Sequence, residues 1–599
     1  MLASTGNNQG NSIRTLFRFL PAVLLLAAAG ASGQANDNWV NATTIPSLPF
    51  TTSEPDMYQA TVEGTDPFPP CLPVISEPVI GNNSLWYKYT PVQDIEYITL
   101  TIPYQQPTAA VISVYTGNPT DGFRVVSGGC ATESFDDLGT RIAGLRLSGG
   151  TTYSIEVTSY YGSLSNHDPM SFSVASSAVY HVTNTADNAG AVCGADCSLR
   201  QAISASNSAP GAVVIPAGTY KLTIADADQF ANEYLNATGS LDALRGMGIY
   251  GAGMHQTIID ANHLNRALHL DPVSSLSSRE SFAIGDLTIT NGHAVPTNTH
   301  ASGGGGLLLA SGTDYFGLER VAATSNQSDV YGGGGVTLDS PGAIRDSLVS
   351  GNIASVASAS GGGLSLGTPD GRYMEISGTT ISGNSATGEG GGIDAFATLR
   401  ISNSTFSGNH ANRNGGGINL YGSGSSLHMA SSTVVLNTAQ DNPFHSGDGG
   451  GGLNLDSGSN SIVNSIVAYN TTANPTDPQD CLKAETASLT SSYNYVATTT
   501  GDTFAGIGGP CQFLGLGDVS NSDPGVSHIL GNNGGLTPTH ALLANSPAQD
   551  SGDPGGCRDA AGMLLDYDQR GAGFPRASNG TCDKGAFEFI DKIFANGFN

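Results

Sequence analysis

Two pairs of oppositely charged residues stand close together in the middle of this sequence, Asp370 with Arg372 and Asp394 with Arg400. An acid and a base that converge on a sugar are what a polysaccharide lyase or a glycoside hydrolase requires. Exposed ion pairs of this kind are also common without any function. The surrounding repeats contain no Gly-His-Gly with an Arg-x-Lys, and lysine is nearly absent from them. We therefore expect no catalysis, and these four residues are the candidates if the chain is an enzyme.

A second set of polar and aromatic residues recurs at equal positions after three glycine blocks. There the sequence alternates as Ile-Asp-Ala-Phe, Ile-Asn-Leu-Tyr and Leu-Asn-Leu-Asp. If these segments stack as strands in register, every second residue belongs to a row on the outer face. Aromatic rings beside amides and carboxylates predict a carbohydrate-binding surface, unless segment 438–448 or the N-terminal region covers the rings. The two predicted rows are Asp394, Asn419 and Asn454, and Phe396, Tyr421 and Asp456.

The glycine blocks mark a repeat. Each is followed by an aliphatic residue, and between the blocks a small or apolar residue is followed three positions later by Asn, at intervals of 25 to 35 residues. A period of this size indicates one supersecondary unit per repeat, stacked so that neighbours share a core. The blocks are 303–306, 332–335, 361–363, 390–392, 415–417 and 449–452, and the Asn markers are Asn326, Asn352, Asn384, Asn409, Asn437 and Asn470, with Asn291 as a forerunner.

The pattern after each block predicts β-strands, because apolar and polar residues alternate with period two and the glycine runs disfavour helices. Glycine supplies positive φ at one corner of each repeat, and stacked Asn amides suit a second corner. The predicted fold is all-β, a right-handed parallel β-helix. Its predicted inward residues are Leu307, Val336, Leu364, Ile393, Ile418 and Leu453, with Leu309, Leu338, Leu366, Ala395, Leu420 and Leu455.

Other segments predict further domains. An apolar stretch after Arg14 and Arg18 ends in small residues, as in a secretory signal. Short alternating runs separated by turns then predict an antiparallel β-sandwich. Ser198 is the expected N-cap of a helix over 199–206 that plugs the solenoid. The expected divisions are 1–35 signal peptide, 36–178 β-sandwich, 179–206 solenoid cap, 207–480 β-helix repeats, 481–589 C-terminal part and cap, and 590–599 tail.

Charge and cysteine content limit the function. The formal net charge of −28 excludes nucleic acid as a partner, and no segment after the signal is long and apolar enough to span a membrane. Eight cysteines with local spacing indicate disulfides in an oxidising compartment. We expect no metal centre and no cofactor, and calcium binding by the surplus acids is left open. The expected disulfides are Cys71–Cys130, Cys193–Cys197, Cys481–Cys511 and Cys557–Cys582.

Several motifs resemble those of known families. The segment Phe406-Ser-Gly-Asn409 resembles repeats of polymorphic outer-membrane proteins, and other repeats carry Ile or Val in the Phe place. Residues 197–203 resemble the Cys-Ser-Leu-Arg-Glu-Ala segment of secreted bacterial β-helix proteins, with Gln201 instead of Glu. Residues 534–588 resemble the terminal domain of choice-of-anchor proteins, and 591–599 resemble short sorting tails. The β-sandwich resembles jelly-roll modules of secreted bacterial proteases. These resemblances imply a secreted or cell-surface protein of a Gram-negative bacterium.

The sequence therefore predicts a non-enzymatic, adhesin-like or extracellular-matrix-binding protein, because a repetitive face suits multivalent contacts. Its expected partner is an extracellular polysaccharide or a cell-surface protein. One alternative is a polysaccharide lyase or glycoside hydrolase that acts on an extracellular glycan. Another is a purely structural surface protein.

Overall fold

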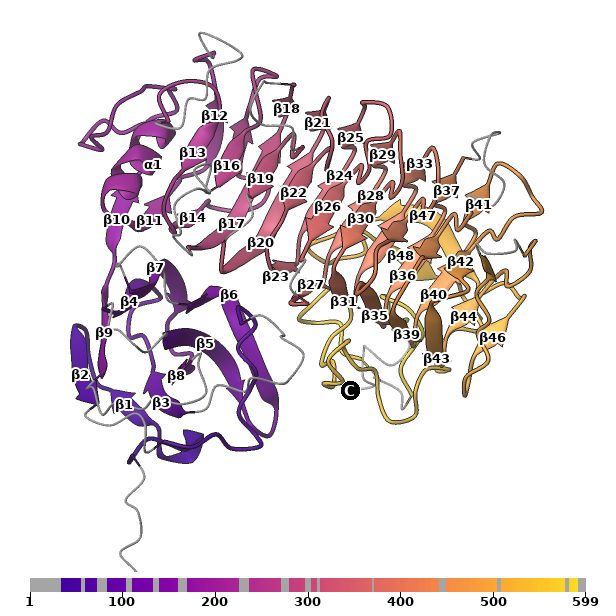
Figure 1. The fold of residues 1–599 in the computed structure, drawn as a ribbon, viewed down its shortest axis with the longest axis horizontal. Helices are drawn as coiled ribbons and strands as arrows, with labels where there is room; N and C mark the ends of the chain where they lie inside the picture. Colours follow the sequence, from indigo (N-terminus) through magenta and orange to yellow (C-terminus); the bar gives the residue numbers. More distant parts are fainter. Residues whose placement is uncertain are drawn as a thin grey trace, which may run out of the picture.

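The computed structural model describes most of the chain between residues 34 and 590 (Figure 1). The predicted signal peptide up to residue 33, the tail from residue 591, and Asp370 lie outside the described residues. The described ranges are 34–54, 60–72, 83–103, 110–132, 139–159, 170–225, 236–270, 280–296, 303–309, 313–368, 371–440, 449–503, 508–576 and 581–590.

The N-terminal part is a β-sandwich whose two sheets enclose one apolar core. Its strands alternate, as in β9, where Met170, Phe172 and Val174 are buried and their neighbours are not. All pairings are antiparallel except that of β1 with β3. After the 3-10 helix η1 (Trp39–Asn41), one sheet has the order β1 (Thr43–Ile45), β3 (Ser84–Tyr89), β8 (Tyr153–Ser159), β5 (Ala110–Asn118), β6 (Gly122–Thr132), and the other β2 (Phe50–Glu54), β9 (Met170–Ser176), β4 (Ile95–Ile102), β7 (Thr140–Ser148).

A helix closes the solenoid at its N-terminal end, as predicted. Helix α1 (Leu199–Ser208) begins with a capping box, because Ser198 and Gln201 each accept a hydrogen bond from the other's backbone N–H. Arg200 is fully buried and pairs with Asp187, 2.7 Å away, while its other donors reach three backbone carbonyls at 238–240. The disulfide Cys193–Cys197 fixes the segment just before the helix.

Behind the helix the chain winds into a parallel β-helix with about ten turns and three sheets. The twelve predicted inward residues are all buried, which confirms the predicted core. The largest sheet carries two strands from most turns: β10 (Ala178–His181), β11 (Gly211–Val214), β12 (Gly218–Lys221), β14 (Gly248–Tyr250), β15 (Thr257–Asp260), β17 (Ser281–Thr290), β20 (Tyr315–Thr324), β23 (Gly342–Arg345), β24 (Leu348–Ser350), β27 (Tyr373–Ser377), β28 (Thr380–Ser382), β31 (Thr398–Ser402), β32 (Thr405–Ser407), β35 (Ser426–Ala430), β36 (Thr433–Val435), β39 (Ser459–Val463), β40 (Ile466–Ala468), β43 (Ser488–Ser492), β44 (Tyr495–Val496) and β46 (Val519–Ser520).

Two narrower sheets complete each turn. The strands after the glycine blocks belong to a ten-stranded sheet, and the strands after the Asn markers belong to a seven-stranded one. The first contains β13 (Leu241–Ala243), β16 (Leu268–Leu270), β19 (Leu307–Leu309), β22 (Val336–Leu338), β26 (Leu364–Gly367), β30 (Ile393–Phe396), β34 (Ile418–Leu420), β38 (Leu453–Leu455), β42 (Cys481–Ala484) and β45 (Gly508–Pro510); the second contains β18 (His293–Ala294), β21 (Gln327–Ser328), β25 (Ile353–Ala354), β29 (Ser385–Ala386), β33 (His410–Ala411), β37 (Thr438–Ala439) and β41 (Thr471–Thr472).

The six Asn markers form a buried ladder, as predicted. Each side-chain amide donates to the carboxamide oxygen of the next Asn at 2.9–3.0 Å, and that oxygen also accepts the backbone N–H of the preceding Asn. The ladder ends on Asp480, whose Oδ1 accepts both donors of Asn470. Burial raises the pKa of Asp480 to about 7. Every polar group in this corner is therefore satisfied by the turn above or below it.

The β-sandwich is docked on the side of the solenoid. Strands β6 and β7 lie against β17 and β20, so the sandwich covers the first half of the largest sheet (Figure 1). Thr132 donates to Asp314 through both its backbone and its hydroxyl, and Arg141 pairs with Glu280 at 3.1 Å. The ring of Tyr315 is fully buried in an apolar cluster shared by the two parts. These buried contacts fix the sandwich relative to the solenoid.

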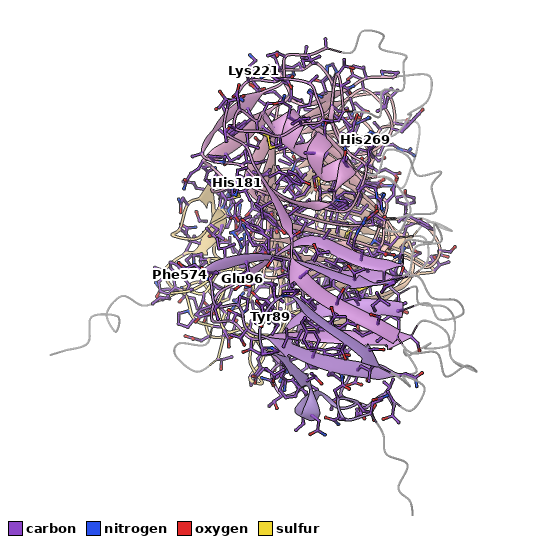
Figure 2. All side chains as sticks on the ribbon, turned by 90° about the vertical axis from the view of Figure 1, so that its left-hand side faces the viewer. Tyr89, Glu96, His181, Lys221, His269 and Phe574 are labelled. Carbon is purple, nitrogen blue, oxygen red and sulfur yellow. A yellow bond between two sulfur atoms is a disulfide. The ribbon has the colours of Figure 1, made fainter. Side chains whose placement is uncertain are left out.

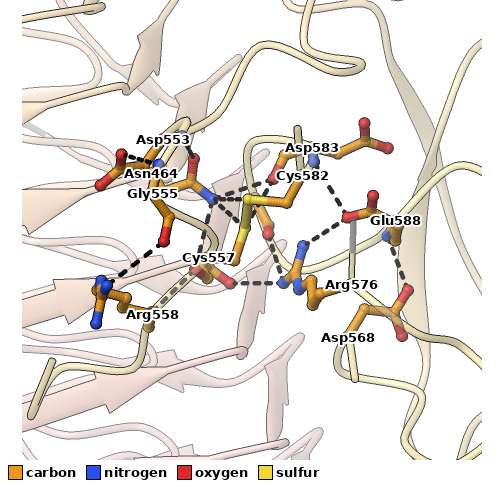
Figure 3. The surroundings of a disulfide bond; sticks show 12 residues. Asn464, Asp553, Gly555, Cys557, Arg558, Asp568, Arg576, Cys582, Asp583 and Glu588 are labelled. Carbon is orange, nitrogen blue, oxygen red and sulfur yellow. Dashed lines mark hydrogen bonds and ion pairs between the residues drawn. A yellow bond between two sulfur atoms is a disulfide. The ribbon is translucent and has the colours of Figure 1, made fainter. Parts of the chain in front are cut away.

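The chain after the last turn runs back along the solenoid, shown in yellow in Figure 1. It contains a hairpin of β47 (Val526–Gly531) and β48 (Thr539–Leu542). Figure 3 shows the disulfide Cys557–Cys582 beside Asn464 of the solenoid, with Arg576 next to Glu588. Arg124 of the sandwich lies 3.8 Å from Asp559, so this returning segment reaches the first domain.

All four disulfides pair as expected from the sequence. None of the helices in the described part of the chain has the length and apolar character that a membrane crossing requires.

Candidate functional site

The first predicted row exists, but it is not an open surface. Parallel pairing places Asp394, Asn419 and Asn454 side by side at the middle of β30, β34 and β38. The alternate residues of these strands fill the core, so this row points outward. The exposed fractions are nevertheless only 6%, 0% and 7%. The expectation that these residues face water is therefore wrong, because groups of the preceding corners lie over them.

The corner before β30 shows how this cover arises. Gly390 has a φ of 64°, and a Cβ there would lie 2.3 Å from the carbonyl oxygen of Ile393. Only glycine lets the turn fold so closely over the strand that follows. The residue before it, Glu389, extends its carboxylate over the row and accepts a hydrogen bond from Asn419.

One amide joins the two acids of this site. The side-chain nitrogen of Asn419 donates to Asp394 Oδ1 at 2.7 Å and to Glu389 Oε2 at 3.2 Å. The amide of Asn454 donates to Asn419 Oδ1 at 2.7 Å, which fixes the orientation of Asn419. Arg413, from the equivalent corner of the next turn, lies 3.8 Å from Glu389 Oε1. The row is therefore a preorganised support for two carboxyl groups.

The two carboxyl groups have different environments. The pKa of Asp394 is raised to about 8, because burial and the charge of Glu389 raise it more than the hydrogen bond from Asn419 lowers it. Asp394 therefore keeps its proton at neutral pH. Glu389, in contrast, is a quarter exposed and paired with Arg413. A buried carboxyl group that keeps its proton near neutral pH is the usual basis of a general acid.

The second predicted row supplies the aromatic side chains. Phe396 and Tyr421 lie 5.9 Å apart between ring centroids, inclined by 34°, and Tyr421 is 40% exposed. Asp456 follows at the exposed end of β38. Burial raises the pKa of Tyr421 to about 12, with contributions from the charges of Asp394, Asp339 and Glu389. The phenol therefore lies within electrostatic range of a cluster of three acids.

Asp339 and Glu389 are members of this cluster that we did not predict. Asp339 directly follows β22, and burial raises its pKa. The spacing contained this signal, because Asp339 follows Leu338 as Phe396 follows Ala395. Glu389 immediately precedes a glycine block. Only the folded corner shows that its side chain extends over the row, and the sequence alone did not indicate this.

The two predicted catalytic arginines make their contacts elsewhere, away from Asp394. Arg372 donates to the backbone carbonyls of Cys71 and Asp314 and therefore belongs to the contact between the domains. The guanidinium of Arg400 lies 3.9 Å from the ring centre of Tyr373. Arg400 lies on β31 of the largest sheet, whereas Asp394 lies on the ten-stranded one. A sequence separation of six residues crosses a corner here, so the two side chains lie on different faces.

Among the described residues, no group of three or more His, Cys, Asp or Glu side chains is arranged to hold a metal ion. Calcium binding thus stays a prediction.

Comparison with known proteins gives only remote likenesses. No family model matches the chain, and no curated protein matches it. Among solved structures, the catalytic domain of a GH87 alpha-1,3-glucanase in complex with nigerose is 12% identical, with 74% of this chain and 89% of that chain covered and a TM-score of 0.25. The Agl-KA catalytic domain is 12% identical, with 78% and 90% covered and a TM-score of 0.24. Scores this low carry no functional assignment.

Proposed function

We propose that this chain is a secreted glycoside hydrolase that acts on a neutral extracellular glycan, with its active site around Asp394. The observation that carries the proposal is a carboxyl group that stays protonated at neutral pH and shares one amide with a second carboxylate. This observation favours a glycoside hydrolase, the alternative function predicted from the sequence, over an adhesin-like function. The four disulfides support a secreted location.

In the proposed reaction the corner at 389–390 moves aside to admit the glycan, because Asp394 is only 6% exposed. Asp394 then donates its proton to the glycosidic oxygen while the bond from that oxygen to the anomeric carbon breaks. Glu389 attacks the anomeric carbon and forms a glycosyl ester. Asp394, now ionised, takes a proton from water, and the resulting hydroxide displaces Glu389. One oxygen of each carboxyl group lies 2.7 or 3.2 Å from the same amide nitrogen of Asn419. This closeness supports the retaining spacing of about 5–5.5 Å over the roughly 6.5–9.5 Å of inverting enzymes.

The charges around the site favour a neutral substrate. Arg413, the cation beside Glu389, is already paired with that carboxylate at 3.8 Å. A uronate would therefore meet a cation that is already paired, in a chain whose formal net charge is −28. A lyase acting on acidic glycans would need an unpaired base and a cation in the same place. The cluster therefore supports hydrolysis of neutral chains.

The test is incubation of residues 36–599 with neutral and acidic polysaccharides, following new reducing ends and the anomer of the first product by NMR. We expect cleavage of a neutral glycan with retained configuration. Release of the inverted anomer would overturn the role of Glu389, and unsaturated products would indicate a lyase. Binding of the protein to a glycan without any cleavage would instead support the adhesin-like function.

Replacement of both rings, in Phe396→Ala with Tyr421→Ala, should raise KM for the cleaved glycan about tenfold or more, because ring faces contribute on the order of 1 kcal/mol each to sugar contact. The measurement is KM and kcat on a soluble oligosaccharide. Tyr331→Ala removes another exposed ring and serves as the control. An unchanged KM would show that the glycan does not lie on this pair.

A further inference from the structure

A cavity of about 420 Å³ lies where the β-sandwich joins the solenoid. Its walls come from the turn at 46–48, the end of β3, the turn that leads into β4, and the linker at 176–179 that enters β10. Figure 2 labels Tyr89 and Glu96, which lie beside each other in this region. The volume falls within the range of about 300–1,000 Å³ typical of small-ligand sites. Neither the proposed active site nor any predicted row uses it.

The lining has the chemistry of a neutral sugar site. Ser47, Thr90, Ser176 and Ser177 line it together with Tyr89 and Tyr97 and four apolar residues, Pro46, Leu48, Val92 and Val179. None of the described residues that line it is Lys, Arg or His. Hydroxyl and phenol groups both donate and accept hydrogen bonds, as sugar hydroxyls require, and the rings suit the apolar face of a pyranose. Anionic ligands have no cationic partner here.

The walls are held in place before any ligand arrives. Glu96 accepts hydrogen bonds from the hydroxyl of Tyr89 at 2.5 Å and from the backbone of Val92 and Gln93 at 2.8 and 3.1 Å. Burial raises the pKa of Glu96, but these hydrogen bonds outweigh it and leave the pKa below its usual range. The carboxylate therefore stays charged and holds the turn at Val92 and Gln93 against Tyr89 at the end of β3. A preformed wall loses little entropy on binding.

The second wall depends on the contact between domains. The ring of Tyr97 lies 5.6 Å from that of Tyr250 in the solenoid, and the guanidinium of Arg146 lies 4.4 Å from the Tyr250 ring centre. At the mouth, Val92 is 87% exposed, so an apolar side chain stands free beside the opening. The contact with Tyr250 thus holds the ring of Tyr97 in the wall, and the exposed side chain of Val92 offers apolar contact beside it.

We propose that this cavity is a second, non-catalytic carbohydrate site that takes one or two neutral sugar units. It is separate from the cluster around Asp394, which lies on β30 of the ten-stranded sheet. Binding there would anchor a glycan to the sandwich independently of whether the solenoid cleaves it.

The test is saturation-transfer NMR of residues 36–599 with maltose, cellobiose and mannobiose. We expect transfer to the ring protons of at least one disaccharide. Ser176→Trp places a large ring in the cavity from an exposed position, so it should weaken binding about tenfold or more. Ser208→Trp, at an exposed helix end, is the matched control and should bind as the parent does. Equal thermal midpoints of the two variants show that both are folded.

Three results would overturn the proposal: no transfer to any of the sugars, equal binding by Ser176→Trp and Ser208→Trp, or loss of binding in the variant with Phe396→Ala and Tyr421→Ala. The last result would place the sugar at the solenoid site. A negative result in the cleavage assay would not contradict the proposed sugar site, because Asp394 does not line the cavity.

Discussion

Asp394→Asn should abolish glycan cleavage and at the same time stabilise the protein at neutral and alkaline pH. Removal of a general acid lowers kcat about 10²–10⁴-fold. Asn keeps the shape of Asp394 and still accepts from Asn419, but it cannot protonate the leaving oxygen. The measurements are kcat on the cleaved glycan and the thermal midpoint of unfolding between pH 4 and pH 9.

The stability effect has a definite sign. The pKa of Asp394 is raised from 3.8 in the unfolded chain to about 8 in the folded one. Its contribution to stability is fully present below pH 3.8 and is lost as the pH rises through about 8, because the folded state must then hold a buried charge. Asn does not titrate, so the advantage of Asp394→Asn should grow with pH across this window.

Asp502→Asn is the matched control, because Asp502 is an exposed acid of the last turns. It should leave kcat and the pH dependence of the midpoint unchanged. If Asp394→Asn destabilises the protein at pH 8 as much as at pH 5, Asp394 is ionised in the folded state and the proposed proton donor is wrong. If stability rises but cleavage persists, the acid is another residue.

Asn409→Ala should cause the largest loss of stability among single substitutions in the solenoid corner. Asn409 donates to the carbonyl of Ile381 and to Asn437, and it accepts two hydrogen bonds from Asn384. Alanine leaves these groups buried without partners, at a cost of about 3–5 kcal/mol. For a chain of this size the midpoint should fall by about 3–4 °C, which calorimetry would measure.

Asn412→Ala serves as the control, because Asn412 is exposed and only its neighbour His410 contacts its side chain through a hydrogen bond. We expect a change within about 0.5 kcal/mol. A loss for Asn409→Ala no larger than this would mean that water replaces the amide and that the ladder contributes little to stability.

Much of the fold could be predicted because the signals are local and periodic. The glycine blocks, the alternation after them and the Asn markers each specify one part of a turn, and repetition fixes their register. This is why residues as far apart as Asp394, Asn419 and Asn454 could be assigned to one row. The helix after Ser198 was predictable for the same reason, since a capping box is a short-range pattern.

The site could be predicted only in part. Stacking placed Asp394 beside Asn419, but the cover over them depends on how each corner folds, and the corners differ in length from turn to turn. Arg400 was expected near Asp394 because it is close in sequence, and a corner placed it on another sheet. Glu389 entered the cluster through a contact between turns that no spacing rule describes, whereas the alternation that gives Phe396 also gives Asp339.

The sequence by itself determined the all-β class, the parallel β-helix, its core residues and the order of stacked polar rows, because periodic patterns allow one register only. The tertiary structure decided which row is buried, which carboxyl group keeps its proton, and where the β-sandwich and the returning C-terminal segment lie. Those properties arise from burial and from contacts between segments that are distant in sequence. Such contacts exist only in the folded chain.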